Sequence, residues 1–204
     1  MDLLIQILEY IGVFAFAVSG TIVAIQEDFD LFGICCMAAV TAMGGGVLRD
    51  IVADVGVPVF FQDWTTIPII LVAVAVACKL GNRWEYNRLF VAVDAAGLAV
   101  FVVSAGLKGI DQGYNFMLFL FASGITGVGG GILRDIITNR KPAVFQSDIY
   151  TLAGLLGALA LWVLHPLIGA QWAAAVSLVI IFMVRMFCYL HNINLPVIHY
   201  RKDD

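Results

Sequence analysis

One charged, glycine-rich motif occurs twice in this sequence, and its residues are the ones best suited to chemistry. Residues 44–51 read GGGVLRDI, and residues 129–136 read GGGILRDI, a constant shift of 85 positions. Three consecutive glycines weaken a helix by about 1 kcal/mol each relative to alanine. We therefore expect two helices to be broken or kinked at the triplets, which are Gly44, Gly45, Gly46 and Gly129, Gly130, Gly131.

A broken helix inside a membrane offers a site for a charged ligand. Irregular backbone at that depth is tolerated only where protein or a water-filled cavity satisfies its polar groups, so the motif predicts a conduit. The carbonyls released near residues 41–43 and 126–128 suit a dehydrating cation, whereas the amides that start the next half-helix suit an anion. The break alone leaves the sign of the ligand open.

The arginine and aspartate of each motif fall within the predicted spans, where unpaired charges are costly. Arg49 and Arg134 are pore-lining or gating candidates together with Asp50 and Asp135. Neighbours on a helix point about 100° apart, so we expect the acidic partner of each arginine to come from the other repeat. The alternative is a structural ion pair that reaches toward the membrane surface.

Further polar residues recur at the same shift and are weaker candidates for lining the conduit. Glu9 and Asp94 are mirrored acids that would concentrate cations, or else lie at the headgroup level. The hydroxyls are as consistent with helix contacts as with a pore lining; they are Ser19, Ser104, Thr41 and Thr126. Lys108, at the end of a span, is expected to anchor its helix at the membrane interface, with voltage sensing as the alternative.

The composition requires lipid as the solvent of this chain. Hydrophobic residues make up 62% of the sequence, charged residues 13%, and the mean hydropathy is +0.98, against roughly 25% charged residues in soluble domains. The net charge is −4 and the basic residues form no stripe, so nucleic acid is not expected as a partner. No nucleophile–base or metal-ligand set falls within the spans, so we expect no enzyme, no cofactor and no metal beyond transient K⁺.

Seven apolar stretches are close to the about 20 residues needed to cross hydrocarbon. They lie at 3–25, 31–54, 66–81, 89–107, 115–138, 148–165 and 171–190, with a turn at His165 and Pro166. The fold class is therefore an all-α polytopic membrane protein, one membrane domain over residues 1–204. Its predicted parts are repeat one (1–85), repeat two (86–168), a seventh helix (169–191) and a tail (192–204).

Three helices per repeat is an odd number, so the two copies enter the membrane from opposite sides. In such inverted repeats the site lies at the repeat interface near the bilayer midplane.

Basic residues in the short loops set the orientation: seven lie on one side (Lys79, Arg83, Arg88, Arg140, Lys141, Arg201 and Lys202), and Lys108 lies on the other. This bias predicts an integral membrane protein with its N-terminus outside and its C-terminus cytoplasmic.

The doubled GGG-x-LRD motif in the second and fifth spans resembles the prokaryotic branch of the TRIC family, the trimeric intracellular cation channels. That branch overlaps a bacterial group with a glycine-transporter-like domain. The resemblance covers nearly the whole chain. It implies a homotrimer in the lipid of a prokaryotic inner (plasma) membrane, with a pore inside each subunit that passes monovalent cations, potassium above sodium. The basic lipid-binding motif of animal members has no lysine here, where Val47, Leu48, Arg49 and Asp50 stand, so lipid regulation is not carried over.

Two functions remain open at this stage. A passive potassium-permeable channel agrees with the acidity and with the near-perfect internal symmetry. A secondary transporter of a small zwitterion such as glycine is the alternative, because alternating-access carriers also use inverted repeats with two broken helices.

Overall fold

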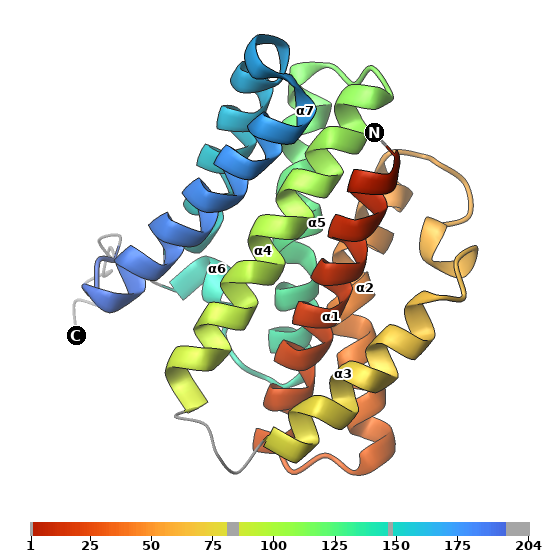
Figure 1. The fold of residues 1–204 in the computed structure, drawn as a ribbon. Helices are drawn as coiled ribbons and strands as arrows, with labels where there is room; N and C mark the ends of the chain where they lie inside the picture. The colour runs from red at the N-terminus through yellow and green to blue at the C-terminus, as the bar shows by residue number, and fades with distance from the viewer. Residues whose placement is uncertain (1, 81–85, 147–148, 195–204) are drawn as a thin grey trace, which may run out of the picture.

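The protein is a bundle of apolar helices, described here in a computed structural model that covers residues 2–80, 86–146 and 149–194 (Figure 1). The helices are α1 (Asp2–Gln26), α2 (Leu31–Val52), α3 (Thr66–Leu80), α4 (Tyr86–Asp111), α5 (Phe116–Ile137), α6 (Ala143–Gln146) and α7 (Tyr150–Leu190), and a 3-10 turn η1 (Val59–Phe61) follows α2. The predicted all-α polytopic fold is confirmed.

The longest helix, α7, consists of two spans rather than one. Its 41 residues are interrupted at Gly169, whose φ of 79° and ψ of 166° are not helical, and Figure 1 shows the chain reversing at the top of the bundle. The predicted turn at His165 and Pro166 is therefore misplaced by a few residues. Proline has a φ that suits a helix, so the helix continues through Pro166, and the reversal occurs at a glycine, which tolerates positive φ.

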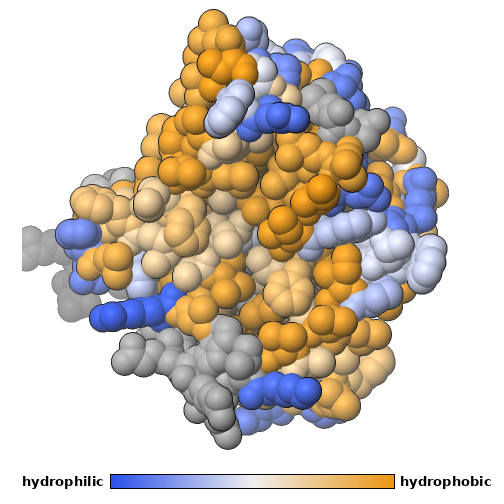
Figure 2. Space-filling view, in the orientation of Figure 1, coloured by the Kyte–Doolittle hydropathy of each residue, from blue (hydrophilic) through white to orange (hydrophobic). Residues whose placement is uncertain are grey.

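Seven apolar helical segments result within the described residues. Helices α1, α2, α4, α5 and α7 are each long and apolar enough to cross a membrane, and α7 supplies two crossings. Helix α3 is a shorter apolar helix of 15 residues. The side-chain surface agrees, since Figure 2 shows apolar residues across the middle of the visible face. The chain is an integral membrane protein.

The predicted break at the glycine triplets is wrong, because α2 and α5 both run through them as unbroken helices. The glycines instead let the two helices touch backbone to backbone. A Cβ on Gly45 would overlap the carbonyl oxygen of Thr126, and a Cβ on Gly130 would overlap that of Thr41. Close packing of this kind compensates for the low helix propensity of glycine.

The two halves of the chain exchange equivalent contacts, as an inverted repeat requires. A Cβ on Gly12 would meet the Phe101 ring at 2.9 Å, and one on Gly97 would overlap the Phe16 ring. Those two rings pack on each other with their centroids 5.2 Å apart. Helices α1 and α4, which carry these residues, run in opposite directions in Figure 1.

The connections repeat as well. Asp30 caps α2 by accepting from Gly33 N, and Asn115 caps α5 by accepting from Leu118 N, 85 positions later in both donor and acceptor. Asp54 and Asn139 both follow their helices with positive φ, at 53° and 54°. The short elements η1 and α6 follow Pro58 and Pro142. The symmetry therefore extends from the motif to the loops.

Candidate functional site

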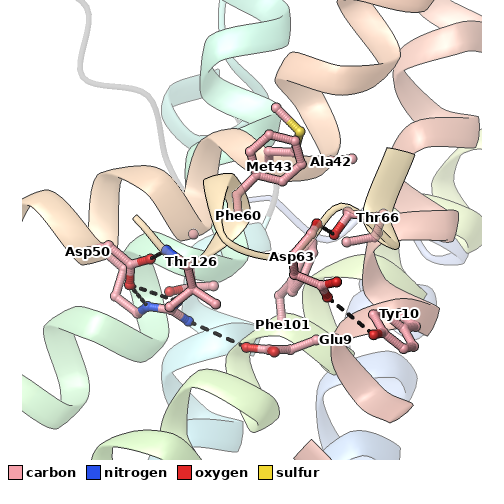
Figure 3. Close-up of a pocket in the computed structure, with 14 residues that line it drawn as sticks. Glu9, Tyr10, Ala42, Met43, Asp50, Phe60, Asp63, Thr66, Phe101 and Thr126 are labelled. Atoms are coloured by element: carbon pink, nitrogen blue, oxygen red, sulfur yellow. Dashed lines mark hydrogen bonds and ion pairs between the residues drawn. The ribbon is translucent and has the colours of Figure 1, made fainter. Parts of the chain in front are cut away.

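A pocket opens at the end of the bundle where α1 begins, here called the N-terminal face. It lies among α1, α2, η1, α4 and α5 and is called the N-face pocket. Figure 3 shows Glu9, Asp50, Asp63 and Tyr10 around it, and Thr126 and Phe101 are also among its lining residues. The opposite end, where α7 ends, is called the C-terminal face.

Arg49 forms the charged wall of the N-face pocket and is only 7% exposed. Its Nε and Nη2 both lie 2.8 Å from Asp50 Oδ1, whereas its Nη1 is 3.9 Å from Glu9 Oε1. The other Asp50 oxygen accepts from Val59 N at 3.0 Å, which fixes the start of η1. Glu9 Oε1 also accepts from Lys108 Nζ at 3.3 Å.

The opposite wall of the pocket joins α1 to the connection before α3. Tyr10 donates its hydroxyl to Asp63 Oδ2 at 3.1 Å and lies 2.7 Å from the Thr65 hydroxyl. The Thr65 hydroxyl donates to Asp63 Oδ1 at 2.5 Å, which lowers the pKa of that carboxyl below its ordinary value. Sequence reasoning missed the pair of Tyr10 and Asp63, because the repeat gives no signal for it; residue 95, which corresponds to Tyr10, is an alanine.

At the C-terminal face, the residues equivalent to Glu9, Arg49 and Asp50 form a closed group with Ser19, here called the C-face cluster: Ser19, Asp94, Arg134 and Asp135. Arg134 Nη1 lies 2.6 Å from Asp94 Oδ1 and 2.5 Å from the Ser19 hydroxyl, and Nε donates to Asp135 Oδ1 at 2.8 Å. The guanidinium also stacks over the Phe90 ring, 5.0 Å from its centroid. At 3% exposure Arg134 is buried and fully engaged.

The predicted origin of the acidic partners is wrong in both clusters. Arg49 and Arg134 each bond the aspartate that follows them, because the guanidinium folds back to reach it. The second acid, Glu9 or Asp94, comes from the same repeat as its arginine. The other repeat contributes a hydroxyl, that of Ser19. Both arginines are buried and ion-paired, as the alternative of a structural ion pair expects.

Between the two ends, the candidate conduit-lining groups make contacts within and between helices. Thr41 and Thr126 return their hydroxyls to Met37 O and Ala122 O in the preceding turns, at 2.8 and 2.6 Å. Ser104 likewise bonds Phe101 O at 3.3 Å. The carbonyls of Thr41 and Thr126 face Gly130 and Gly45, so they are not free to bind a cation as predicted. Of these hydroxyl residues, Thr126 also lines the N-face pocket.

A pair of inverted repeats with buried ionic groups at both ends and a lipid-facing exterior is the architecture of a channel or carrier of small solutes. Residues 6–80 and 91–166 match the family described as "Glycine transporter". A UPF0126 membrane protein of Deinococcus radiodurans is 36% identical over 193 residues, which is 93% of this chain and 90% of that protein. The chain therefore belongs to this glycine-transporter family of membrane proteins.

Solved structures place the same fold among the TRIC channels. A prokaryotic TRIC channel superposes with a TM-score of 0.88 at 23% identity, covering 96% of this chain and all of that one. The orthologue of the trimeric intracellular cation channel from Rhodobacter sphaeroides gives 0.87 at 26% identity, covering 93% and 98%. The resemblance to the TRIC family stated from the doubled motif is confirmed.

Proposed function

We propose that the protein is a potassium-permeable channel for monovalent cations, with a path inside each subunit along the interface of the two repeats. The observation that carries the proposal is the pair of equivalent charged groups at the two ends of that interface. The N-face pocket holds Glu9, Arg49 and Asp50, with Gly46 and Thr126 also in its lining, and the C-face cluster holds Asp94, Arg134 and Asp135. Helices α1, α2, α4 and α5 contribute these groups, so the path is enclosed by one chain.

The charge of the N-face pocket favours cations. The charged groups at the pocket are three carboxylates, those of Glu9, Asp50 and Asp63, and two cations, Arg49 and Lys108. One negative charge is therefore in excess at the opening. Because its hydrogen bonds lower the pKa of Asp63, that carboxylate stays ionised at neutral and mildly acidic pH. A local negative potential raises the concentration of cations at an entrance.

The described conformation is the closed state of this channel. Arg134 bridges Asp94 on α4 and Ser19 on α1, which seals the C-terminal face, and the crossing at Gly45 and Gly130 seals the middle. Opening requires the Arg134 bridge to part and α2 and α5 to separate at the glycines. Their missing side chains let the two helices slide with little steric cost.

The family relationship extends the proposal to the assembly and its setting. The Rhodobacter sphaeroides protein is described as trimeric, and we propose a homotrimer in membrane lipid, its subunits each holding one path. The bias of basic residues toward the side of the α3–α4 and α5–α6 connections favours a cytoplasmic location for that side. The N-face pocket then faces outward from a prokaryotic inner membrane.

A carrier of a small zwitterion is the second candidate, and one observation favours it. One end of the path is open while the equivalent end is sealed, which is the state that an alternating-access carrier adopts. The pocket also places carboxylates, which bind an ammonium group, beside Arg49, which binds a carboxylate. The family description points in the same direction.

Transport in proteoliposomes separates the two functions. In vesicles that contain no valinomycin, a channel dissipates a potassium gradient. The rate of potassium flux does not saturate over the millimolar range of potassium, and unlabelled glycine has no effect on it. A carrier instead accumulates labelled glycine by counterflow and saturates. Potassium flux without glycine counterflow supports the proposal, and counterflow without potassium flux overturns it.

A further inference from the structure

The two ends of the path carry the same three charged groups but hold them differently. Glu9, Arg49 and Asp50 at the N-terminal face correspond to Asp94, Arg134 and Asp135 at the C-terminal face. The bond between arginine and the following aspartate is 2.8 Å at both ends. The contact with the second acid differs, because Arg134 lies 2.6 Å from Asp94 and Arg49 lies 3.9 Å from Glu9.

A further cation lies near each group but in a different place: at the C-terminal face Arg185 stacks over the Tyr150 ring, 4.9 Å from its centroid, whereas at the open end a lysine contacts the second acid itself. Lys108, near the end of α4, places its Nζ 3.3 Å from Glu9 Oε1, which is also the oxygen nearest to Arg49. The position that corresponds to Lys108 in the other repeat is Val23, an apolar residue of 1% exposure. Asp94 has no such lysine, and it binds Arg134 directly.

We propose that Lys108 is a positioning residue that keeps the N-terminal face open by drawing Glu9 away from Arg49. Without Lys108, Glu9 retains Arg49 as its one neighbouring cation, and a partly buried carboxylate favours its nearest counter-charge strongly. The charged groups would then match those of the C-face cluster, and Glu9 would close over the pocket as Asp94 does at the other end. The proposal rests on the proposed function in taking the pocket as the entrance of the path.

A difference in side-chain size offers a competing explanation of the open end. After the motif the repeat shift falls to 84, so Thr66 in the N-face pocket corresponds to Tyr150. Tyr150 is buried, and its hydroxyl and the Arg134 guanidinium lie 3.6 and 3.7 Å from the place of a Gly131 Cβ. The pocket could be open merely because threonine is small. Thr66→Tyr tests this explanation separately.

Thiol labelling measures the opening directly and needs no ion flux. Gly46 lines the N-face pocket, and a Cβ there would meet only Arg49 Nη2, at 4.0 Å, so Gly46→Cys has room. The reporter is placed in the full-length protein with its four native cysteines changed to alanine, and a membrane-impermeant maleimide is added at the N-terminal face. Gly131→Cys is the matched reporter for the C-face cluster, with the maleimide added at the C-terminal face.

Neutralising Lys108 should close the pocket. Lys108→Met, which keeps the length of the side chain, should slow labelling of Gly46→Cys about tenfold, and Lys108→Val should act in the same way. Lys108→Arg should label at the rate of the parent, because it retains the cation. Glu9→Gln should abolish the effect of Lys108→Met, since a neutral amide does not pair tightly with Arg49. Labelling of Gly131→Cys should not change in any of these variants.

Three results would overturn the role of Lys108. Labelling of Gly46→Cys could stay fast in Lys108→Met and Lys108→Val while both variants elute from gel filtration like the parent. The slowing could persist in the Glu9→Gln background. Thr66→Tyr alone could close the pocket while Lys108→Met leaves it open. A protein that fails to conduct potassium but shows the predicted labelling would contradict the channel proposal and leave the role of Lys108 supported.

Discussion

At the scale of single residues, the contacts distinguish the two arginines that the sequence presents as equivalents. Arg134 contacts Asp94, Asp135 and Ser19 and is screened from water, whereas Arg49 has one short contact, with Asp50, and borders a pocket. Removing one member of a buried ionic group leaves the others uncompensated, which costs about 3–5 kcal/mol in soluble proteins. Removing one charged partner beside an open pocket lowers the free energy of unfolding by less, because water can solvate the charge that is left.

Arg134→Gln should therefore lower the free energy of unfolding by about 2–4 kcal/mol, and Arg49→Gln by about half of that or less. Unfolding in detergent with increasing urea, followed by circular dichroism, gives both values. Asp94→Asn is the matched control and should resemble Arg134→Gln, because it removes the other half of the 2.6 Å pair. An Arg49→Gln variant that is as unstable as Arg134→Gln would contradict this assignment.

At the scale of the helices, the packing of α2 on α5 depends on two glycines that face backbone. A methyl group at Gly45 or Gly130 would overlap a threonine carbonyl, which cannot move as a flexible side chain can. Gly46 belongs to the same triplet but faces the N-face pocket. The three residues look alike in the sequence and differ in what surrounds them.

Gly45→Ala and Gly130→Ala should each reduce the thermal unfolding temperature, to a comparable degree because the repeat gives them equivalent surroundings. Gly46→Ala should leave it unchanged or raise it slightly, since alanine favours a helix by about 1 kcal/mol over glycine where no atom obstructs it. Thermal unfolding in detergent compares the three variants. If Gly46→Ala proves as damaging as Gly45→Ala, the triplet serves a common role other than this crossing.

The sequence predicts the helices well and the site only in part. Seven apolar stretches and the shift of 85 residues give the spans and the inverted repeat, because span length and repeat parity are set by hydropathy alone. The glycine triplet misled the prediction, since helix propensity favours a break, and only the position of Thr126 against Gly45 shows why the helix stays intact. Contacts of Tyr10 with Asp63 and of Lys108 with Glu9 join residues 53 and 99 positions apart, and no periodicity indicates them.

At the scale of the whole molecule, the termini of the helical bundle lie at opposite ends, since α1 begins near the top of Figure 1 and α7 ends at its lower left. An odd number of crossings requires this arrangement. The excess of basic residues on the side where α7 ends predicts that this side is cytoplasmic. Alkaline phosphatase fused after Asp204 should be inactive and green fluorescent protein fused there should fluoresce. The reverse pattern would show that the orientation is inverted.

Assembly is a second property of the whole molecule. Large apolar side chains on α7 are exposed to lipid or to neighbouring subunits, among them Leu156, Val163, Val179 and Met183. From the family relationship we expect chemical cross-linking in mild detergent to stop at three subunits, with dimers only as intermediates. A ladder that ends at two subunits, in several detergents and at several cross-linker concentrations, would contradict the homotrimer.

The central claim is that potassium crosses the membrane between the two repeats of one subunit, and a cysteine at the base of the N-face pocket tests it most directly. Thr126 lines that pocket and lies at the α2–α5 crossing. In the variant Thr126→Cys, free of other cysteines, a positively charged thiol reagent added at the N-terminal face should block unitary potassium currents in a planar bilayer. The parent without cysteine should be unaffected. Complete modification of Thr126→Cys with unchanged currents would show that the ions take another route.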